Sequence, residues 1–214
     1  MNKYIYICII FLALLSSCAN LGGGPQGGPR DTIPPVVVKE SPINGTLNFD
    51  AKRIEIHFDE YIQLDDIQKN VLISPPQQRP PEVKAIGKTL SIVFAESLLD
   101  STTYTIDFGA AICDYNEKTP LYGYVYSFST GDVIDSLAVA GRVYNAENLD
   151  PVPSVLIGIH SNHADSAMNT LPFARITRSD EEGYFTIHNI HEGAYRLYAL
   201  NDISRDYLYQ PGEA

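Results

Sequence analysis

The chain has 214 residues, of which 15 are basic and 26 acidic, so its formal net charge at pH 7 is -11. This balance argues against nucleic acid as a partner, because binding to phosphates requires a surface rich in Lys and Arg. Hydrophobic residues make up 44% of the chain, which is ordinary for folded proteins and argues against disorder throughout. The low charged fraction of 19%, together with 14 Tyr, 14 Pro and 15 Gly, favours an extracytoplasmic all-β protein.

The first segment, residues 1–17, has the form of a signal peptide. Its apolar run at positions 4–15 is too short to span a bilayer as a helix, which takes about 20 residues. The sequence Leu-Ser-Ser-Cys at positions 15–18 resembles the lipobox of bacterial lipoproteins. The resemblance implies cleavage between Ser17 and Cys18, with diacylglycerol joined to the thiol of Cys18. The alternative is an ordinary signal peptide with an incidental cysteine at its end.

Residues 18–30 are rich in glycine and are predicted to form a flexible tether. Several acyl chains on one cysteine give the stable membrane anchoring that a single chain does not. Ala19 follows the cysteine where Asp would mark retention, which resembles lipoproteins sent to the outer membrane of Gram-negative envelopes. We therefore expect a lipid-anchored outer-membrane protein, and leave open whether it faces the periplasm or the outside.

The three cysteines agree with this assignment. Cys8 lies in the signal segment and Cys18 is the expected lipidation site, so Cys113 is the remaining thiol. An intrachain disulfide is then excluded in the mature chain. Cys113 ends the apolar run 110–113, and we expect it to be buried in the core. The alternative, a catalytic thiol, would need a nearby histidine and an activating environment.

Residues 31–131 are predicted to form a β-sandwich. Short strands with close turn signals are expected at 36–39, 54–58, 71–73, 90–94, 104–108 and 124–129. In the second of these, Ile54, Ile56 and Phe58 alternate with polar residues and should share the buried face. The number and spacing of such strands are those of an Ig-like sandwich.

Five motifs in this region resemble the bacterial Ig-like domain of S-layer proteins. They are Asp-Thr-Ile-Pro-Pro at 31–35, Ser-Pro-Ile-Asn-Gly at 41–45, the strand and acidic turn at 54–60, the strand at 98–108, and the ending Tyr-Ser-Phe-Ser-Thr-Gly at 126–131. The resemblance implies an Ig-like fold for residues 31–131. It implies no activity, because a fold does not carry one.

After a linker at 132–137, residues 138–201 are predicted to form a second β-sandwich, with strands at 139–144 and 155–159. The run at 177–197 resembles the carboxypeptidase-regulatory-like family, which has a transthyretin-like β-sandwich and no peptidase residues. In this reading Tyr195 and Leu197 face the core. Residues 202–214 are expected to be an incomplete segment that begins further β structure in a longer protein.

Several groups could bind a metal ion. His160 with His163, and His188 with His191, have spacings seen in zinc sites, but both pairs fall at predicted strand ends, where we interpret them as loop residues. A calcium loop is loosely suggested by three residues near the end of the chain: Asn201, Asp202 and Asp206. Ordinary turn chemistry is the preferred interpretation, and no metal or cofactor is predicted.

The acidic pairs Asp59–Glu60 and Asp65–Asp66 raise the question of glycoside hydrolysis, which uses two carboxylates. Adjacent residues on a strand or loop point apart, so we interpret these pairs as solvent-facing charges. The sequence also lacks a Gly-x-Ser-x-Gly elbow and a phosphate-binding loop.

Tyr122, Tyr124 and Tyr126 alternate along one predicted strand and define a candidate interaction face. Exposed, such a row of rings could stack on sugars or contact a protein; the preferred interpretation is that most of them pack in or across the sandwich. The function expected from the sequence is a non-enzymatic cell-envelope lipoprotein. Its partners would be the membrane, through the lipid, and an envelope protein or glycan. The alternatives are the accessory stalk of an envelope enzyme, whose catalytic domain lies beyond residue 214, and a surface adhesin.

Overall fold

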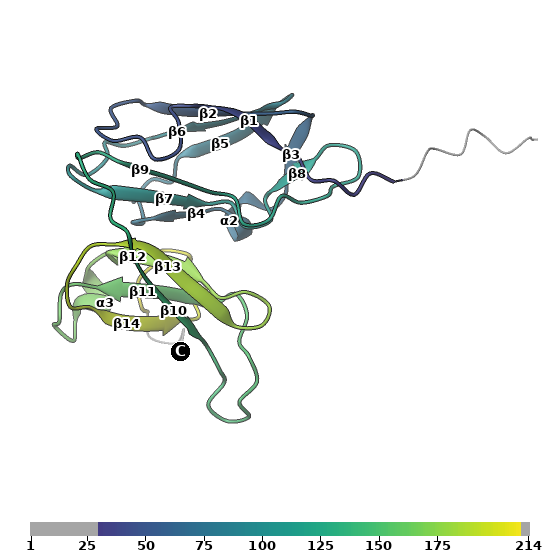
Figure 1. The fold of residues 1–214 in the computed structure, drawn as a ribbon. Coiled ribbons are helices and arrows are strands. Elements are labelled where there is room, and N and C mark those ends of the chain that lie inside the picture. The colour runs from purple at the N-terminus through teal and green to yellow at the C-terminus, as the bar shows by residue number, and fades with distance from the viewer. Residues whose placement is uncertain (1–29, 211–214) are drawn as a thin grey trace, which may run out of the picture. The chain divides into compact units, whose positions relative to one another are not determined.

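The computed structural model describes residues 30–210, which are built almost wholly from antiparallel strands (Figure 1). The expectation of an all-β protein is therefore confirmed. Signal peptide, Cys18 and the tether up to position 29 lie outside the described residues. Within residues 30–210 no helix is long and apolar enough to cross a membrane.

The first module contains strands β1 to β9. One sheet has the order β1-β2-β6-β5, formed by Val37–Ser41, Arg53–Phe58, Thr89–Val93 and Glu82–Ile86. A second sheet has the order β4-β7-β9, formed by Leu72–Ser74, Thr103–Asp107 and Val125–Ser129. A two-stranded sheet pairs β3, Ile62–Leu64, with β8, Ile112–Asp114, and the short helix α2, Ile67–Asn70, follows β3.

The core of this module follows from the alternation of its strands. Ile54, Ile56 and Phe58 of β2 are at most 2% exposed, as their period of two predicts. Their sheet packs against an aromatic group in which the Phe128 ring lies 4.0 Å from that of Phe49 and 5.3 Å from that of Tyr104, measured between centroids. The first module is therefore a sandwich with one continuous apolar core.

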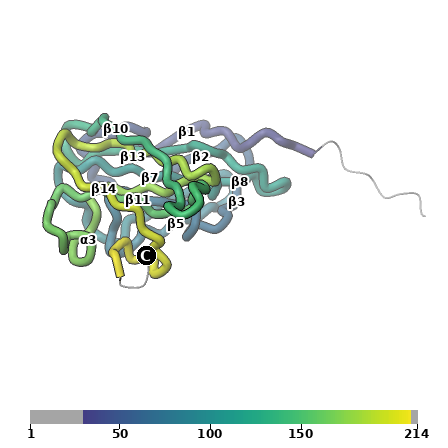
Figure 2. Tube along the Cα trace, turned by 90° about the horizontal axis from the view of Figure 1, so that it is seen from below, coloured from purple at the N-terminus to yellow at the C-terminus, as the bar shows by residue number. Residues whose placement is uncertain are grey.

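The second module contains strands β10 to β14. Strand β10, Leu137–Arg142, pairs with β13, Tyr184–Ile190, and a second sheet has the order β12-β11-β14, from Arg175–Arg178, Leu156–His160 and Arg196–Leu200. Figure 2 shows the trace of β10 beside β13 and that of β14 beside β11, as the pairing requires. The helix α3, Ala167–Thr170, lies in the connection between β11 and β12.

Strand β11 is buried on both faces, because apolar groups pack on each of them. Ile157 and Ile159 contact Ile187 and Ile190, whereas Leu156 lies on the other face in a cluster with Phe173. One expectation is corrected at the sheet edge: Leu197 of β14 is 47% exposed, although its neighbour Ile159 is buried. The reason is that β14 is an edge strand, with no neighbouring strand to cover its core-facing side chain.

Candidate functional site

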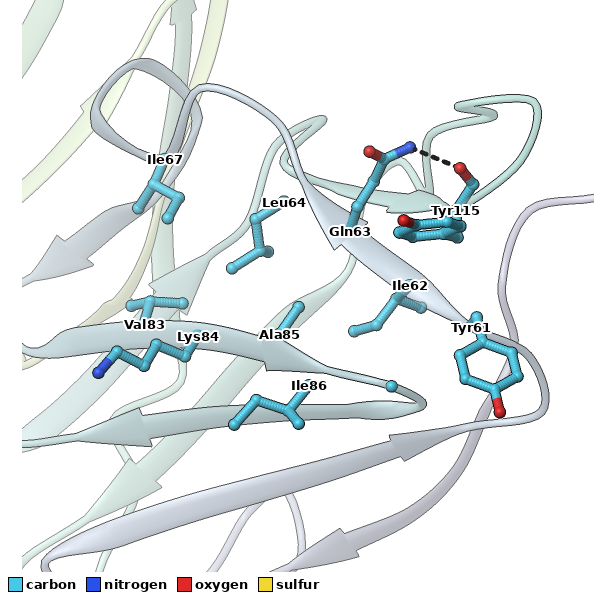
Figure 3. A pocket seen from close by; sticks show the side chains of 11 residues that line it. Tyr61, Ile62, Gln63, Leu64, Ile67, Val83, Lys84, Ala85, Ile86 and Tyr115 are labelled. Carbon is cyan, nitrogen blue, oxygen red and sulfur yellow. Dashed lines mark hydrogen bonds between the residues drawn. The ribbon is translucent and has the colours of Figure 1, made fainter.

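The main candidate site is an open groove in the first module, between β3 and β5 (Figure 3). Its volume is about 660 Å³, within the range of roughly 300–1,000 Å³ that is usual for ligand pockets. Its floor consists of four apolar side chains that belong to the core or pack against it: Ile62, Leu64, Val83 and Ala85. The groove is therefore a place where the core of the sandwich reaches the surface.

The groove has an aromatic end. Tyr61 and Tyr115 lie there, and Ile67 lies at the opposite end (Figure 3). Tyr61 is 62% exposed, Tyr115 63% and the nearby Ile86 71%. Large apolar side chains exposed next to a concave apolar surface are typical of binding sites for proteins or ligands.

A tight turn positions β5. Gly87 has a φ of 63° and connects β5 to β6 together with Lys88, which is the pattern of a two-residue hairpin with glycine first. The ammonium group of Lys88 donates a hydrogen bond to the carbonyl oxygen of Asp59 over 2.6 Å and lies 5.7 Å from the centroid of the Tyr61 ring. These contacts hold the turn against the chain that leads into β3.

The opposite wall is held by the loop after β8. The Asp114 carboxylate accepts three backbone N–H bonds from that loop, from Asn116 at 2.8 Å, Glu117 at 2.7 Å and Thr119 at 2.6 Å. Burial alone would raise the pKa of Asp114, but these hydrogen bonds outweigh it and lower the pKa. Gln63 donates to the carbonyl oxygens of Asp114, at 2.9 Å, and Tyr115, at 3.1 Å. The rim at Tyr115 is thus fixed by backbone contacts.

Sequence reasoning did not find this groove, because β3, β5 and β8 were not among the predicted strands. A usable signal for β5 was present: Val83 and Ala85 alternate with Glu82 and Lys84, directly before Gly87. The strands β3 and β8 have three residues each, too few for alternation to be read. Their approach to β5 is decided by tertiary packing.

The expectation that most of the three tyrosines pack into the sandwich is confirmed, whereas their placement on one face is wrong. Tyr126 is fully buried and donates a hydrogen bond to the carbonyl oxygen of Pro42 over 2.8 Å. Tyr124 is half-buried and donates to the Glu40 carboxylate over 2.7 Å. Tyr122 alone of the three is largely exposed, at 73%. The physical reason is that β9 begins only at Val125 and Gly123 turns the chain with a φ of 71°, so the three rings do not share one strand face.

Burial raises the pKa of both Tyr124 and Tyr126, and for Tyr124 the hydrogen bond to the Glu40 carboxylate adds to the effect. Both phenols therefore stay neutral and serve as hydrogen-bond donors inside the sandwich.

The histidine pairs do not form metal sites. His160 is 2% exposed in β11, whereas His163 is exposed and lies 3.3 Å from the carbonyl oxygen of Ala194. The interpretation of His160 as a loop residue is thus wrong, since it lies inside the module with its ring 4.5 Å from that of Phe173. His188 is exposed, and His191 contacts Asp135. In the part of the chain from 30 to 210 no group of three or more His, Cys, Asp or Glu could hold a metal ion.

The remaining candidates have structural roles. Cys113 is 4% exposed, as predicted for a core residue, and burial raises the pKa of its thiol. Asp59 accepts the N–H of Val36 over 2.8 Å, and Asp66 accepts that of Lys69 over 3.2 Å at the start of α2. Near the end of the chain, Asp206 accepts the N–H of Leu208 over 2.9 Å. These carboxylates stabilise turns. Ser17 and Cys18, the predicted cleavage and lipidation residues, lie outside the described part.

Comparison with known proteins identifies the first module. Residues 31–130 match the family model of the bacterial Ig-like domain. No curated protein matches the chain. One similar solved structure is an L,D-transpeptidase from Mycobacterium smegmatis, with 16% identity over 76% of this chain and 79% of that chain and a TM-score of 0.32. Another is the N-terminal part of the bacterial S-layer protein SbsC, with 13% identity over 78% of this chain and 44% of that chain and a TM-score of 0.31. A third, the major pilin subunit BcpA of Bacillus cereus, has 11% identity, 77% and 58% coverage and a TM-score of 0.23. At these TM-scores the likenesses assign no activity; the first module, residues 31–130, is what matches the bacterial Ig-like domain.

Proposed function

We propose that the protein is a non-enzymatic lipoprotein of the cell envelope whose two β modules act as a scaffold. Cys18 carries the lipid, residues 18–30 form the tether, and the modules present a rigid surface beyond it. The outer membrane is the expected location, as the residue after Cys18 suggests.

The observation that carries the proposal is the polar junction between the two modules. The described residues from Thr32 onward form one compact unit, and the Arg175 side chain at the junction is 10% exposed. The guanidinium donates to the carbonyl oxygens of Asn189 and Ala174, each over 2.8 Å, and to the Asp135 carboxylate over 3.2 Å. Asp135 in turn donates its N–H to the hydroxyl of Thr103 over 3.0 Å.

Further contacts tie the modules together. The Asn189 amide donates to the hydroxyls of Thr105 over 2.7 Å and Ser127 over 2.8 Å, and the N–H of Ile176 donates to the hydroxyl of Ser74 over 3.0 Å. Leu72 of the first module packs into the apolar cluster of Leu156 and Phe173. Domains joined only by a flexible linker are expected to move independently. This junction instead suits a protein that holds its two modules in a fixed geometry and presents them to a partner beyond a flexible tether.

The lipid anchor is tested with Cys18→Ala, expressed from the natural gene and followed by fractionation of the envelope. The wild type is expected in the membrane fraction and the variant in the soluble fraction. Cys113→Ala is the matched control, because it also removes one thiol but leaves the lipobox intact, and it should stay with the membrane. Retention of the Cys18→Ala variant in the membrane would overturn the proposal.

Digestion of intact cells with a protease then separates the two sides of the membrane. Loss of the anchored wild type from intact cells supports presentation to the outside, whereas protection until the outer membrane is opened supports a periplasmic scaffold. The rival function, an accessory stalk, is tested by reading the gene past residue 214: a catalytic domain encoded there would replace the scaffold proposal.

A further inference from the structure

The groove between β3 and β5 is bounded by two strand edges with unpaired backbone groups. Strand β5 is the last strand of its sheet and pairs only with β6, and β3 pairs only with β8. The edges meet where the N–H of Ile62 donates to the carbonyl oxygen of Gly87 over 3.0 Å. Beyond that point no further backbone hydrogen bond joins the two strands within residues 30–210.

The alternation of hydrogen-bonded residues in the sheet shows which backbone groups of β5 face the groove. Lys88 accepts the N–H of Phe58 from β2 over 2.9 Å, so the even-numbered residues of β6 bond to β2 and the odd-numbered ones to β5. Thr89 is therefore the bonded partner of Ile86 across the two-residue turn. Along β5 the bonded residues alternate, which turns the N–H and C=O groups of Val83 and Ala85 away from β6 and into the groove.

The same reasoning applies to β3. The N–H of Tyr115 donates to the carbonyl oxygen of Tyr61, and the N–H of Asp65 to that of Ala111, so the odd-numbered residues bond to β8. Ile62 and Leu64 therefore direct their backbone groups into the groove. Apart from the Ile62 N–H and the Gly87 carbonyl, which bond to each other, both walls thus offer unpaired donors and acceptors above an apolar floor.

We infer that the groove binds an extended peptide segment of another protein by β-strand addition. The open edges supply main-chain hydrogen bonds, and the floor takes apolar side chains at alternate positions of the incoming strand. The single charged residue in the lining, Lys84, contacts the Glu82 carboxylate. The middle of the bound segment is therefore uncharged. The side chains that point away from the floor lie near Tyr61 and Tyr115.

The chain's own tether does not have this chemistry. Residues 18–29 contain one large aliphatic side chain, Leu21, among glycines and prolines, so they offer no alternating apolar pattern and proline breaks strand pairing. The peptide site does not depend on the lipid anchor, because the residues that line the groove all lie between Tyr61 and Tyr115.

The test uses the full chain with Cys18→Ala and a blocked peptide, acetyl-Lys-Val-Thr-Val-Thr-Val-Lys-amide. Amide hydrogen exchange is followed by NMR with and without the peptide. At a peptide concentration about ten times its Kd, exchange of the Val83, Ala85 and Leu64 amides should slow about tenfold, because it then proceeds through the free form. A peptide of the same sequence that is N-methylated at each valine is the control, since it keeps the side chains and charges but loses the N–H donors of the valines, which lie along one edge of an extended strand.

A variant supplies the reverse test. Ala85→Pro removes an N–H that β6 does not use, a position at which proline is tolerated on an edge strand, and should weaken peptide binding at least about tenfold. Ala85→Ser is the matched comparison: it keeps the N–H, so it should bind the peptide more tightly than Ala85→Pro does.

The inference is overturned if the peptide protects no amide of the groove, or if the N-methylated peptide protects them equally. It is also overturned in favour of a second copy of this chain if the protein without peptide sediments as a dimer in which these amides are already protected. Should Ala85→Pro fail to fold, the N-methylated peptide still decides between the outcomes.

Discussion

Replacing Asp135 by alanine tests the junction between the two modules. In the wild type the Asp135 and Arg175 side chains are 16% and 10% exposed. Burial lowers the pKa of Arg175, and the Asp135 carboxylate opposes this shift. Asp135→Ala therefore leaves a nearly buried guanidinium without its counter-charge.

The size of the effect follows from this environment. Removing one partner of a fully buried ion pair costs about 3–5 kcal/mol. The guanidinium of Arg175 keeps its hydrogen bonds to the Asn189 and Ala174 carbonyl oxygens, and some solvent reaches it, so we expect Asp135→Ala to lower the free energy of unfolding by about 2–3 kcal/mol. In Arg175→Met the charge is removed as well, so adding Asp135→Ala to that variant should cost less, with a coupling energy of about 1–2 kcal/mol.

The assay is urea denaturation at pH 7, followed by circular dichroism and by tyrosine fluorescence, which is clean because the chain has no tryptophan. His191→Ala is the control: His191 also contacts Asp135, over 2.8 Å, but its side chain is 78% exposed, so its loss should cost less than about 1 kcal/mol. A loss below about 0.5 kcal/mol for Asp135→Ala, or an equal loss for His191→Ala, would refute the account of the junction.

Three further predictions concern the cores of the modules. Tyr126→Ala should lower the free energy of unfolding by about 3–5 kcal/mol because the ring is fully buried. Tyr122→Ala should lower it by less than about 0.5 kcal/mol, and similar losses for the two variants in urea denaturation would contradict the assignment of Tyr126 to the core. Burial lowers the pKa of His160 below its ordinary value of 6.5, so the unfolded chain binds the proton more readily than the folded one. The free energy of unfolding should therefore fall as the pH drops below 6.5. In His160→Gln this part of the pH dependence between pH 7 and 5 should be lost, and an unchanged dependence would show that His160 does not cause it. In Gly158→Ala the new Cβ would lie 2.4 Å from Cδ1 of the Phe173 ring, which should cost about 1–3 kcal/mol in thermal or urea unfolding; wild-type stability would mean that the ring moves freely.

The strands with long alternating runs could be predicted from the sequence, because their burial follows from local chemistry. The core contains Ile54, Ile56 and Phe58 because residues two apart on a strand share one face. Cys113 is buried, as its apolar neighbours in the sequence indicate. The alternation of the three tyrosines does not predict a common face, because it runs across Gly123, whose positive φ changes the direction of the chain. The burial of His160 at the end of β11 cannot be predicted either, because the sequence pattern there does not mark where the strand stops.

The sequence by itself determined the all-β class, the Ig-like character of residues 31–130 and, as predictions, the lipidation residue and tether. Each of these depends on residue types at short spacing. Only the tertiary structure decided the groove and the junction, because they bring together residues that are distant in the chain. Ile62 meets Gly87, and Asp135 meets Arg175. The hydrophobic periodicity of the sequence does not predict such pairings, because backbone edges and buried charges come together only when the strands pack.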